Sequence, residues 1–412
     1  MYKAAKVNFK SIILKIKLFG LTKFSSGKRR KSDMELDVLV FGSANIDYIT
    51  YVNELPRPGE TLFGMYREQC YGGKGASQCV AAAKLGGRCA LVSKLGNDKL
   101  GDDYFEYLRE LGINVDFVER AEGQQTGLSE IIVADNTENA IIVMAGANQC
   151  LKSTDVSRAR RVFKRAKVLI CQLETNEKAA LCALQQFKGE TILNVSPVPK
   201  NMNEALIKVP TILCVNRLEA AQLTGREEIK TLQDAKAAAN DLIDKGAKSV
   251  IITMGPLGAV HLSSKDRDVC TQCPAAPVRF LADTSGAGEA FLGSLAYHMS
   301  MFPNLCRESH ISAANICAAY AVGHRGTQPS FPGPDLFQED LCQMTPEFNV
   351  IPDKAPTPEP AVSESPSGTA GPHVPEADPK PEPPADQDES KESNEPNKIE
   401  EQKKDERVTI PA

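Results

Sequence analysis

The segment DTSGAGEAF, residues 283–291, has the composition of a phosphoryl-transfer loop. Gly286, Ala287 and Gly288 would present consecutive backbone amides without bulky side chains, directly before an apolar stretch that we expect to be helical. Amides gathered at a helix N-terminus can stabilise the charge that builds on a transferred phosphoryl group. Glu289 follows them and could take the proton of an attacking hydroxyl. This segment alone is equally consistent with Glu289 only stabilising the helix dipole, an effect of about 0.3–1 kcal/mol.

A second Gly-rich segment, GGKGAS at residues 72–77, precedes an Ala-rich stretch. Glycine permits positive φ and close approach of the backbone, and a helix that begins there offers free N–H groups to a polyhydroxy or anionic ligand. An ordinary strand-to-helix turn is nevertheless the better explanation for an isolated hexamer of this kind.

Apolar runs alternate with amphipathic stretches, and four of the runs that we expect to be buried strands are LDVLVFGSANID from residue 36, AKVLICQLE from 166, PTILCVN from 210 and KSVIITM from 248. Such alternation predicts an α/β fold with a central, mostly parallel sheet flanked by helices. The carboxyl ends of parallel strands meet at one edge, where ligands bind. The expected strand ends carry Asp47, Glu174, Asn216 and Thr253, which predicts a single ligand crevice. Residues 48–71 and 128–144 contain short alternating stretches typical of a smaller, separate sheet.

Composition divides the chain into three parts. Residues 1–33 hold 10 Lys or Arg against one Asp, and residues 353–412 hold 15 acidic and 7 basic residues with many prolines and no Phe, Tyr or Trp. We expect a disordered basic extension over 1–33, a folded domain over 34–345 and a disordered acidic tail over 346–412. For the extension, an organelle-targeting segment or a membrane-surface helix stays open. We expect a cytoplasmic protein, with nuclear location also open.

The net charge of −5 and the mildly acidic central part argue against a nucleic-acid partner, and no apolar run reaches the length of a membrane span. Twelve scattered Cys residues indicate a reduced, intracellular chain. The pair Cys270 and Cys273 has no second pair nearby, so we favour a structural role over zinc or redox chemistry. The His residues show no metal-ligand spacing: His261, His298, His310, His324 and His373.

GGKGASQ and DTSGAGEAF together resemble the two signatures of the ribokinase family of carbohydrate kinases. CQLE, the Asn-x-x-Glu of VNRLEA, ITMGPLG and GTQPSFP occur in the order that this family has, and AGAN is typical of its ribokinase branch. The resemblance covers about residues 36–342. It implies a Rossmann-like ribokinase fold with a small β-sheet lid, and ATP-dependent phosphorylation of D-ribose at its 5-hydroxyl.

The resemblance also implies roles for single residues at the sugar end. Asp47 would accept hydrogen bonds from ribose hydroxyls, which suits a carboxylate because buried hydroxyls need acceptors. Glu289 holds the position of the catalytic base, and Gly286 to Gly288 form the anion hole. The implied sugar-site residues are Asn45, Ile46, Asp47, Gly73, Lys74, Gly75, Ala76, Ser77, Glu174 and Glu289.

At the nucleotide end, the resemblance implies that Asn216 and Glu219 organise the ATP phosphates and Mg²⁺. The other implied nucleotide-site residues are Thr253, Met254, Gly255, Pro256, Leu257, Gly258, Gly288 and Asn315. An activating monovalent cation, K⁺, would lie near Asp283, Ser285, Ala321, His324, Gly326 and Ser330. Relatives pair through their lids, so a homodimer is expected.

Two positions depart from the family pattern. Glu289 stands where the family has Asp, which moves the charge by about 1 Å, and a displacement of that size can slow a position-dependent reaction about 100-fold. Ser77 stands where the family has Asn, so a ribose hydroxyl would be met through water or not at all. The sequence therefore leaves two alternatives: a nucleotide-binding pseudokinase that acts through partners, and a kinase for another small sugar or nucleoside.

Overall fold

The computed structural model describes residues 35–135, 138–336 and 348–352, all within a compact unit that ends at Pro356. The expected basic extension and most of the expected acidic tail lie outside the described residues. Within the described ranges, no helix is long and apolar enough to cross a membrane.

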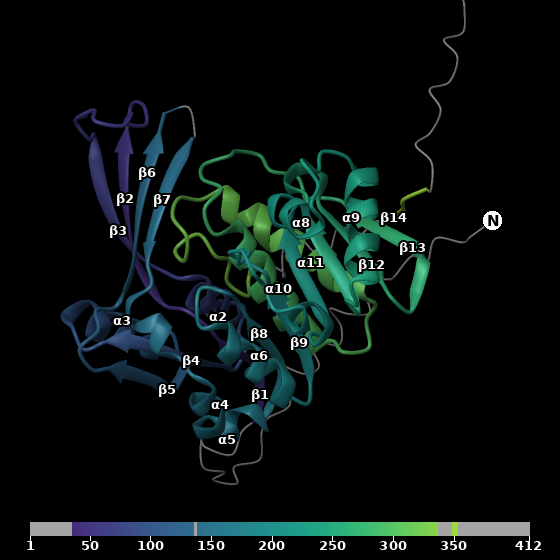
Figure 1. The fold of residues 1–412 in the computed structure, drawn as a ribbon, viewed down its shortest axis with the longest axis horizontal. Helices are drawn as coiled ribbons and strands as arrows, with labels where there is room; N and C mark the ends of the chain where they lie inside the picture. The colour runs from purple at the N-terminus through teal and green to yellow at the C-terminus, as the bar shows by residue number, and fades with distance from the viewer. Residues whose placement is uncertain (1–34, 136–137, 337–347, 353–412) are drawn as a thin grey trace, which may run out of the picture. The chain divides into compact units, whose positions relative to one another are not determined.

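The main sheet has ten strands in the order β14-β13-β12-β11-β10-β9-β8-β1-β4-β5 (Figure 1). The seven strands from β11 to β5 run parallel, while β12, β13 and β14 are antiparallel to their neighbours. Their bounds are β1 Leu36–Phe41, β4 Cys89–Gly96, β5 Asn114–Ala121, β8 Ala166–Cys171, β9 Glu190–Asn194, β10 Ile212–Asn216, β11 Ser249–Thr253, β12 Ala259–Ser263, β13 Asp266–Cys273 and β14 Asn349–Val350. The expected mostly parallel sheet is confirmed. The expected domain end at residue 345 is too early, because β14 pairs with β13 beyond it.

Helices cover both faces of this sheet because the side chains of its strands alternate between two buried clusters. Leu39 and Phe41 of β1 belong to one cluster, and Val38 and Val40 belong to the other. The first cluster is covered by α4 Ser153–Arg158, α5 Arg160–Phe163, α6 Glu177–Gln186, α7 Ala205–Lys208, α8 Arg217–Thr224 and α9 Leu232–Asp244. The second is covered by α2 Lys74–Lys84, α3 Lys99–Glu110, α10 Ala287–Met301 and α11 Arg307–Val322. Two short 3₁₀ turns complete the described elements, η2 Gly146–Cys150 and η3 Gly255–Leu257.

The two cysteines of β13 lie on opposite faces of the sheet. Cys270 packs into the first cluster and Cys273 into the second. Because side chains three residues apart on a strand point to opposite sides, the pair cannot hold a single metal ion. This geometry supports the structural role that we favoured.

A second, four-stranded sheet is separate from the main one and has the order β3-β2-β6-β7 (Figure 1). Its strands are β2 Asn45–Val52, β3 Tyr66–Gly72, β6 Gly127–Ala134 and β7 Asn139–Met144. This is the expected lid. One expectation was wrong: β1 ends at Phe41, so Asp47 is not at the end of a main-sheet strand but is the third residue of β2 in the lid sheet.

Candidate active site

The loop before α2 brings the lid strands against the main sheet. Gly73 has φ 81°, and a Cβ at this residue would lie 2.6 Å from the amide nitrogen of Asn45. A larger residue therefore cannot occupy this position without moving the chain. The Gly-rich loop is thus packed directly onto the segment that leads into Asp47.

Glu174, which follows β8, is held by this loop. Its Oε2 accepts a hydrogen bond of 2.6 Å from the Ser43 hydroxyl and one of 3.0 Å from the backbone N–H of Lys74. A carboxylate at the beginning of α2 satisfies an amide that has no partner inside the helix. Glu174 therefore fixes the N-terminus of α2 beside the expected sugar site.

Asp47 is a buried carboxylate, 8% exposed. Its pKa is raised from 3.8 to about 7, mainly by burial. The nearby charges of Glu174 and Glu289 also raise it, while a hydrogen bond from Ser129 and the charge of Lys74 act in the opposite direction. The charge of Glu289 therefore acts on Asp47, although the two acids are distant in the sequence.

Lys74, the first residue of α2, contacts the beginning of α10. Its Nζ lies 3.5 Å from Oε1 of Glu289 at the beginning of α10. Burial lowers the pKa of Lys74, but the charges of Glu289, Glu174 and Glu219 outweigh burial and raise it. The side chain therefore remains an ammonium. We use the name Lys74 cluster for this residue and the four carboxylates with which its charge interacts, Asp47, Glu174, Glu219 and Glu289.

The loop before α10 has the geometry expected of an anion hole. Gly286 is the N-cap residue with φ 79°, and α10 continues for 15 residues from Ala287. The amides of Gly288 and Glu289 in the first turn have no partner inside the helix and so are available to an anion, while the Ala287 amide donates to the Thr284 carbonyl at 3.4 Å. A Cβ at Gly288 would meet nothing within 4 Å, so the surface beside this residue is open.

On the nucleotide side, Asn216 and Glu219 form a capping box at the N-terminus of α8. The Asn216 Oδ1 accepts hydrogen bonds of 2.9 Å from the amides of Leu218 and Glu219, and Glu219 Oε2 accepts one of 2.8 Å from the Asn216 amide. Burial raises the pKa of Glu219 above its usual value. The Asn-x-x-Glu spacing therefore has a structural role as well as the role in phosphate and Mg²⁺ binding that the resemblance implies.

The other expected nucleotide residues surround the end of β11. Thr253 ends that strand, η3 turns over residues 255–257, and Gly258 follows with φ 84°. Asn315 of α11 donates hydrogen bonds of 2.9 Å to the carbonyls of Cys273 and Pro274. Its amide nitrogen therefore orders the backbone beside this turn.

The expected cation residues lie on two loops that Asp283 ties together. Its carboxylate accepts hydrogen bonds from the amide of Ser285 at 2.8 Å and from the amide of Gly326 at 3.0 Å. The Val322 carbonyl accepts from the amide of Asp283 at 3.2 Å. Ala321 and Ser330 are buried, and His324 Nδ1 bonds to the Tyr320 carbonyl at 2.8 Å.

Three of the expected sugar-site residues have no exposed side-chain surface: Ile46, Ala76 and Ser77. The Ser77 hydroxyl accepts a hydrogen bond of 3.0 Å from Gln328 Nε2, which also bonds to the Tyr104 hydroxyl at 2.7 Å. Ser77 therefore faces the interior between α2 and the cation loop, and its hydroxyl does not line open space. Tyr104 in turn donates to the Gly72 carbonyl at 2.6 Å.

Sequence reasoning did not assign roles to several residues that hold this site. Asn148 Nδ2 donates to Asn45 Oδ1 at 2.6 Å, and its Oδ1 accepts from the Ala44 amide at 2.9 Å. Asn148 was noted only as the last letter of AGAN. Ser43, Ser129 and Gln328 act through contacts with distant segments, which no local spacing reveals.

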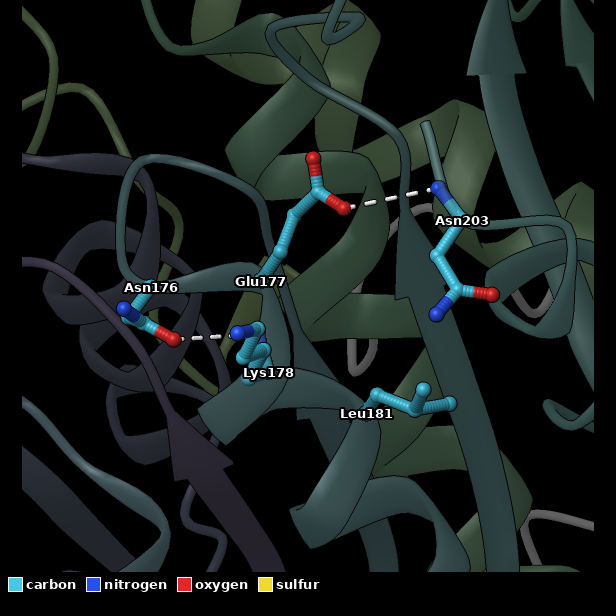
Figure 2. Close-up of a pocket in the computed structure, with 5 residues that line it drawn as sticks. All are labelled: Asn176, Glu177, Lys178, Leu181 and Asn203. Carbon is cyan, nitrogen blue, oxygen red and sulfur yellow. Dashed lines mark hydrogen bonds between the residues drawn. The ribbon is translucent and has the colours of Figure 1, made fainter. Parts of the chain in front are cut away.

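A surface hollow of about 380 Å³ lies at the N-terminus of α6 and is lined by Asn176, Glu177, Lys178, Leu181 and Asn203. Figure 2 shows the Asn176 side chain at the start of the helix, where its oxygen accepts from the Lys178 amide, and the Glu177 carboxylate directed at Asn203. The backbone N–H of Asn203 donates to Glu177 Oε2 at 3.5 Å. None of the expected site residues lines this hollow. The Lys74 cluster carries the charged groups that phosphoryl transfer would need, so this cluster, and not the hollow, is the candidate active site.

Comparison with known proteins agrees with this fold. The pfkB family of carbohydrate kinases matches residues 35–334. Ribokinase from Mus musculus is 38% identical over 307 residues, 74% of this chain and 93% of the relative. Deoxyribokinase from Salmonella typhi is 34% identical over 309 residues, 74% of this chain and 99% of the relative.

Solved structures show the same fold. Ribokinase from Giardia lamblia superposes with a TM-score of 0.69 at 26% identity, covering 73% of this chain and 98% of that one. Arabidopsis thaliana ribokinase complexed with ribose and ATP superposes with a TM-score of 0.67 at 25% identity, covering 76% of this chain and 100% of that one.

Proposed function

The chain belongs to the pfkB family of carbohydrate kinases, and from this premise we propose that it transfers the γ-phosphoryl group of ATP to the 5-hydroxyl of D-ribose. That it is a ribokinase-like sugar kinase, as the motifs predict, follows from its relatives and neighbours. The choice of ribose and of Glu289 as the base is our proposal.

One observation carries this proposal: Lys74 lies 3.5 Å from Glu289, and the charges of both groups act on the buried Asp47. Asp47 would accept hydrogen bonds from sugar hydroxyls, and Glu289 would take the proton from the attacking 5-hydroxyl. The amides of the first turn of α10 and the ammonium of Lys74 would stabilise negative charge on the transferred group. Positioning and charge are the main requirements of phosphoryl transfer, and this cluster supplies both.

The residues present suit the cofactors that we propose. Glu219 provides a carboxylate oxygen, and carboxylates together with phosphate oxygens are the usual ligands of Mg²⁺. The loops around Asp283 provide its carboxylate and the nearby Val322 carbonyl, oxygen donors of the kind that hard cations such as K⁺ prefer. When bound, both ions would offset the negative charge of the phosphates. Asp283 would hold the two cation loops in place through its bonds to Ser285 and Gly326.

A second candidate substrate is 2-deoxyribose, because the deoxyribokinase relative aligns over nearly its whole length. The buried position of Ser77 is compatible with either sugar, since its hydroxyl bonds to Gln328 and not to open space. A pseudokinase role is the remaining alternative and predicts nucleotide binding without turnover.

The test is turnover by the full chain with ATP, Mg²⁺ and K⁺ on D-ribose, 2-deoxyribose and adenosine, with the product identified by phosphorus NMR. We expect ribose 5-phosphate as the main product and at least a 10-fold preference for ribose over 2-deoxyribose in kcat/KM. Preferential phosphorylation of another acceptor, or ATP binding without any transfer, would refute the ribose proposal.

We also propose a homodimer formed through the lid. The edge strand β7 leaves Ile141, Ile142, Val143 and Met144 between 48% and 64% exposed. Exposed apolar edge strands favour pairing with another strand. Sedimentation of the full chain, compared with Ile142→Lys, tests this: we expect the variant to be monomeric. A cytoplasmic location is likewise proposed and can be tested by fluorescence imaging of the tagged full chain.

A further inference from the structure

The C-terminal strand β14 lies beyond the residues that match the family, yet it is firmly attached to the sheet. Ile351 is 3% exposed, and its amide donates a hydrogen bond of 2.8 Å to the Cys270 carbonyl. Its own carbonyl accepts one of 2.7 Å from Lys236 Nζ on α9. These contacts fix the position of the neighbouring residue Asn349.

Asn349 orients the amide of Gln272 on β13. The Asn349 Nδ2 donates to Gln272 Oε1 at 3.0 Å, and Gln272 Nε2 donates to the Leu257 carbonyl at 2.9 Å. The side-chain amide of Gln272 has an acceptor oxygen on one side and a donor nitrogen on the other. Because Asn349 donates to the oxygen, the nitrogen stays directed at the Leu257 carbonyl. Gln272 is 9% exposed, so water cannot easily replace these partners.

Leu257 ends the turn η3 in the nucleotide-side loop, residues 254–258. Gly258 in this loop rests on the end of β13, because a Cβ there would lie 2.0 Å from the Cys273 carbonyl oxygen. The loop is closed by the hydrogen bond from the Met254 amide to the Gly258 carbonyl at 2.7 Å. The bond from Gln272 is therefore a side-chain support for a loop that otherwise depends on backbone contacts.

We propose that β14 is a positioning element for nucleotide binding: Asn349, acting through Gln272, holds the loop 254–258 in its binding conformation. This inference rests on the assignment of that loop to the nucleotide. It assigns a role to residues outside the family match and predicts that changes there alter affinity for the nucleotide and leave affinity for the sugar unchanged.

Two substitutions at the same exposed position separate this role from simple loss of structure. Asn349→Ala removes the donor, and we expect the Kd for ADP, measured by calorimetry on the full chain, to rise about 3- to 10-fold, the effect of one net hydrogen bond. Asn349→Asp places an acceptor against Gln272 Oε1, which turns the amide around and directs its oxygen at the Leu257 carbonyl. We expect this variant to bind ADP more weakly than Asn349→Ala.

Val350→Asp is the matched control, since it adds the same charge to the neighbouring residue, whose side chain is 56% exposed, without touching Gln272. Hydrogen exchange of the 254–258 amides gives a second readout that does not require activity. We expect faster exchange in both Asn349 variants and wild-type exchange in the control. Unchanged ADP affinity and unchanged exchange in both variants would overturn the inference, while the kinase proposal would stand. If the wild type failed to phosphorylate any sugar, the proposed function would fail and the exchange data would still decide this inference.

Discussion

The sugar end and the nucleotide end of the candidate active site differ in burial and in charge. At the sugar end, the charges of three carboxylates, Asp47, Glu174 and Glu289, act together with the ammonium of Lys74 in a largely buried space. At the nucleotide end, the turn η3 and its surroundings are open, with Leu218 65% exposed and Leu257 41% exposed. Charge interactions are stronger in a buried site than at an exposed surface. Substitutions at the sugar end should therefore have large, pH-dependent effects on affinity, activity and stability. Substitutions near the loops should have smaller effects, which arise from changes in packing and loop conformation.

Asp47→Asn should show the largest loss of sugar affinity. A hydrogen bond to a charged acceptor is worth about 1.5–3 kcal/mol, so losing two charged bonds should raise the Kd for ribose about 1,000-fold. The Kd for ADP should change less than about threefold, because Asp47 is in the lid sheet. Calorimetry with ribose and with ADP measures both. An unchanged affinity for ribose would remove Asp47 from the sugar site.

The same variant should be more stable than the wild type at alkaline pH. Because the folded pKa of Asp47 is raised to about 7 from 3.8, the wild type loses stability as pH rises through 7. Asn carries no charge and avoids this loss, so the gain should be present at pH 8, up to about 4 kcal/mol, and small at pH 4. Denaturant unfolding at both pH values tests the sign. A destabilised variant at pH 8 would contradict the burial argument.

Lys74→Met should have the next largest effect. It removes the positive charge that faces Glu289, Glu174 and Glu219, and we expect kcat/KM for ribose to fall about 100-fold. The uncompensated carboxylates should also make the variant less stable, more at pH 8 than at pH 5.5, where protons relieve their repulsion. Lys74→Arg, which keeps the charge, serves as the control. Equal melting temperatures for Lys74→Met and wild type at pH 8 would show that the cluster is not coupled.

Asp283→Ala should reduce activity moderately, through an effect on the two cation loops alone. Without the carboxylate, the amides of Ser285 and Gly326 lose their common acceptor. We expect activity to fall about 10-fold and the response to K⁺ to disappear, since a partly buried carboxylate that accepts two hydrogen bonds is lost. Rates in K⁺ and in tetramethylammonium, at equal ionic strength, measure the response. A variant that K⁺ still activates would contradict this placement of the cation.

Ser77→Asn should have the smallest effect on the KM for ribose, although it introduces the residue that the family has at this position. Ser77 is fully buried against Gln328, and a larger side chain there would overpack the interior at a cost of about 1–3 kcal/mol. We expect a lower melting temperature and less than about a threefold change in the KM for ribose. A large improvement in KM would mean that position 77 does reach the sugar.

The fold and several site residues were predictable because their signals are local. Asn216 and Thr253 end buried strands, as the apolar runs indicate, and the loop before Glu289 is defined by its small residues. Alternating strands and helices gave the parallel sheet for the same reason. The antiparallel strands β12 and β13 were not anticipated, since a short apolar run does not reveal its direction.

The remaining features depend on contacts between distant segments. In the apolar run from residue 36 to Asp47, the chain leaves the main sheet after Phe41 and enters the lid sheet at Asn45. This break at residues 42–44 depends on the Gly-rich loop that packs against it, which the run itself does not reveal. The raised pKa of Asp47 comes from burial and from the charges of Glu174 and Glu289, more than 100 residues away. The same holds for the link from Asn349 to Leu257. Spacing within one segment carries no information about these pairs.

The measurement that tests the account most directly is single-turnover phosphoryl transfer by Glu289→Gln at saturating ATP and ribose. Gln keeps the size of the side chain but cannot accept the proton, and a positioned base contributes about 100- to 10,000-fold. We predict a rate at least 100-fold below wild type with ribose and ADP affinities within about threefold, and a rate for Glu289→Asp at or above wild type. A Glu289→Gln enzyme as fast as wild type would show that Glu289 is not the base.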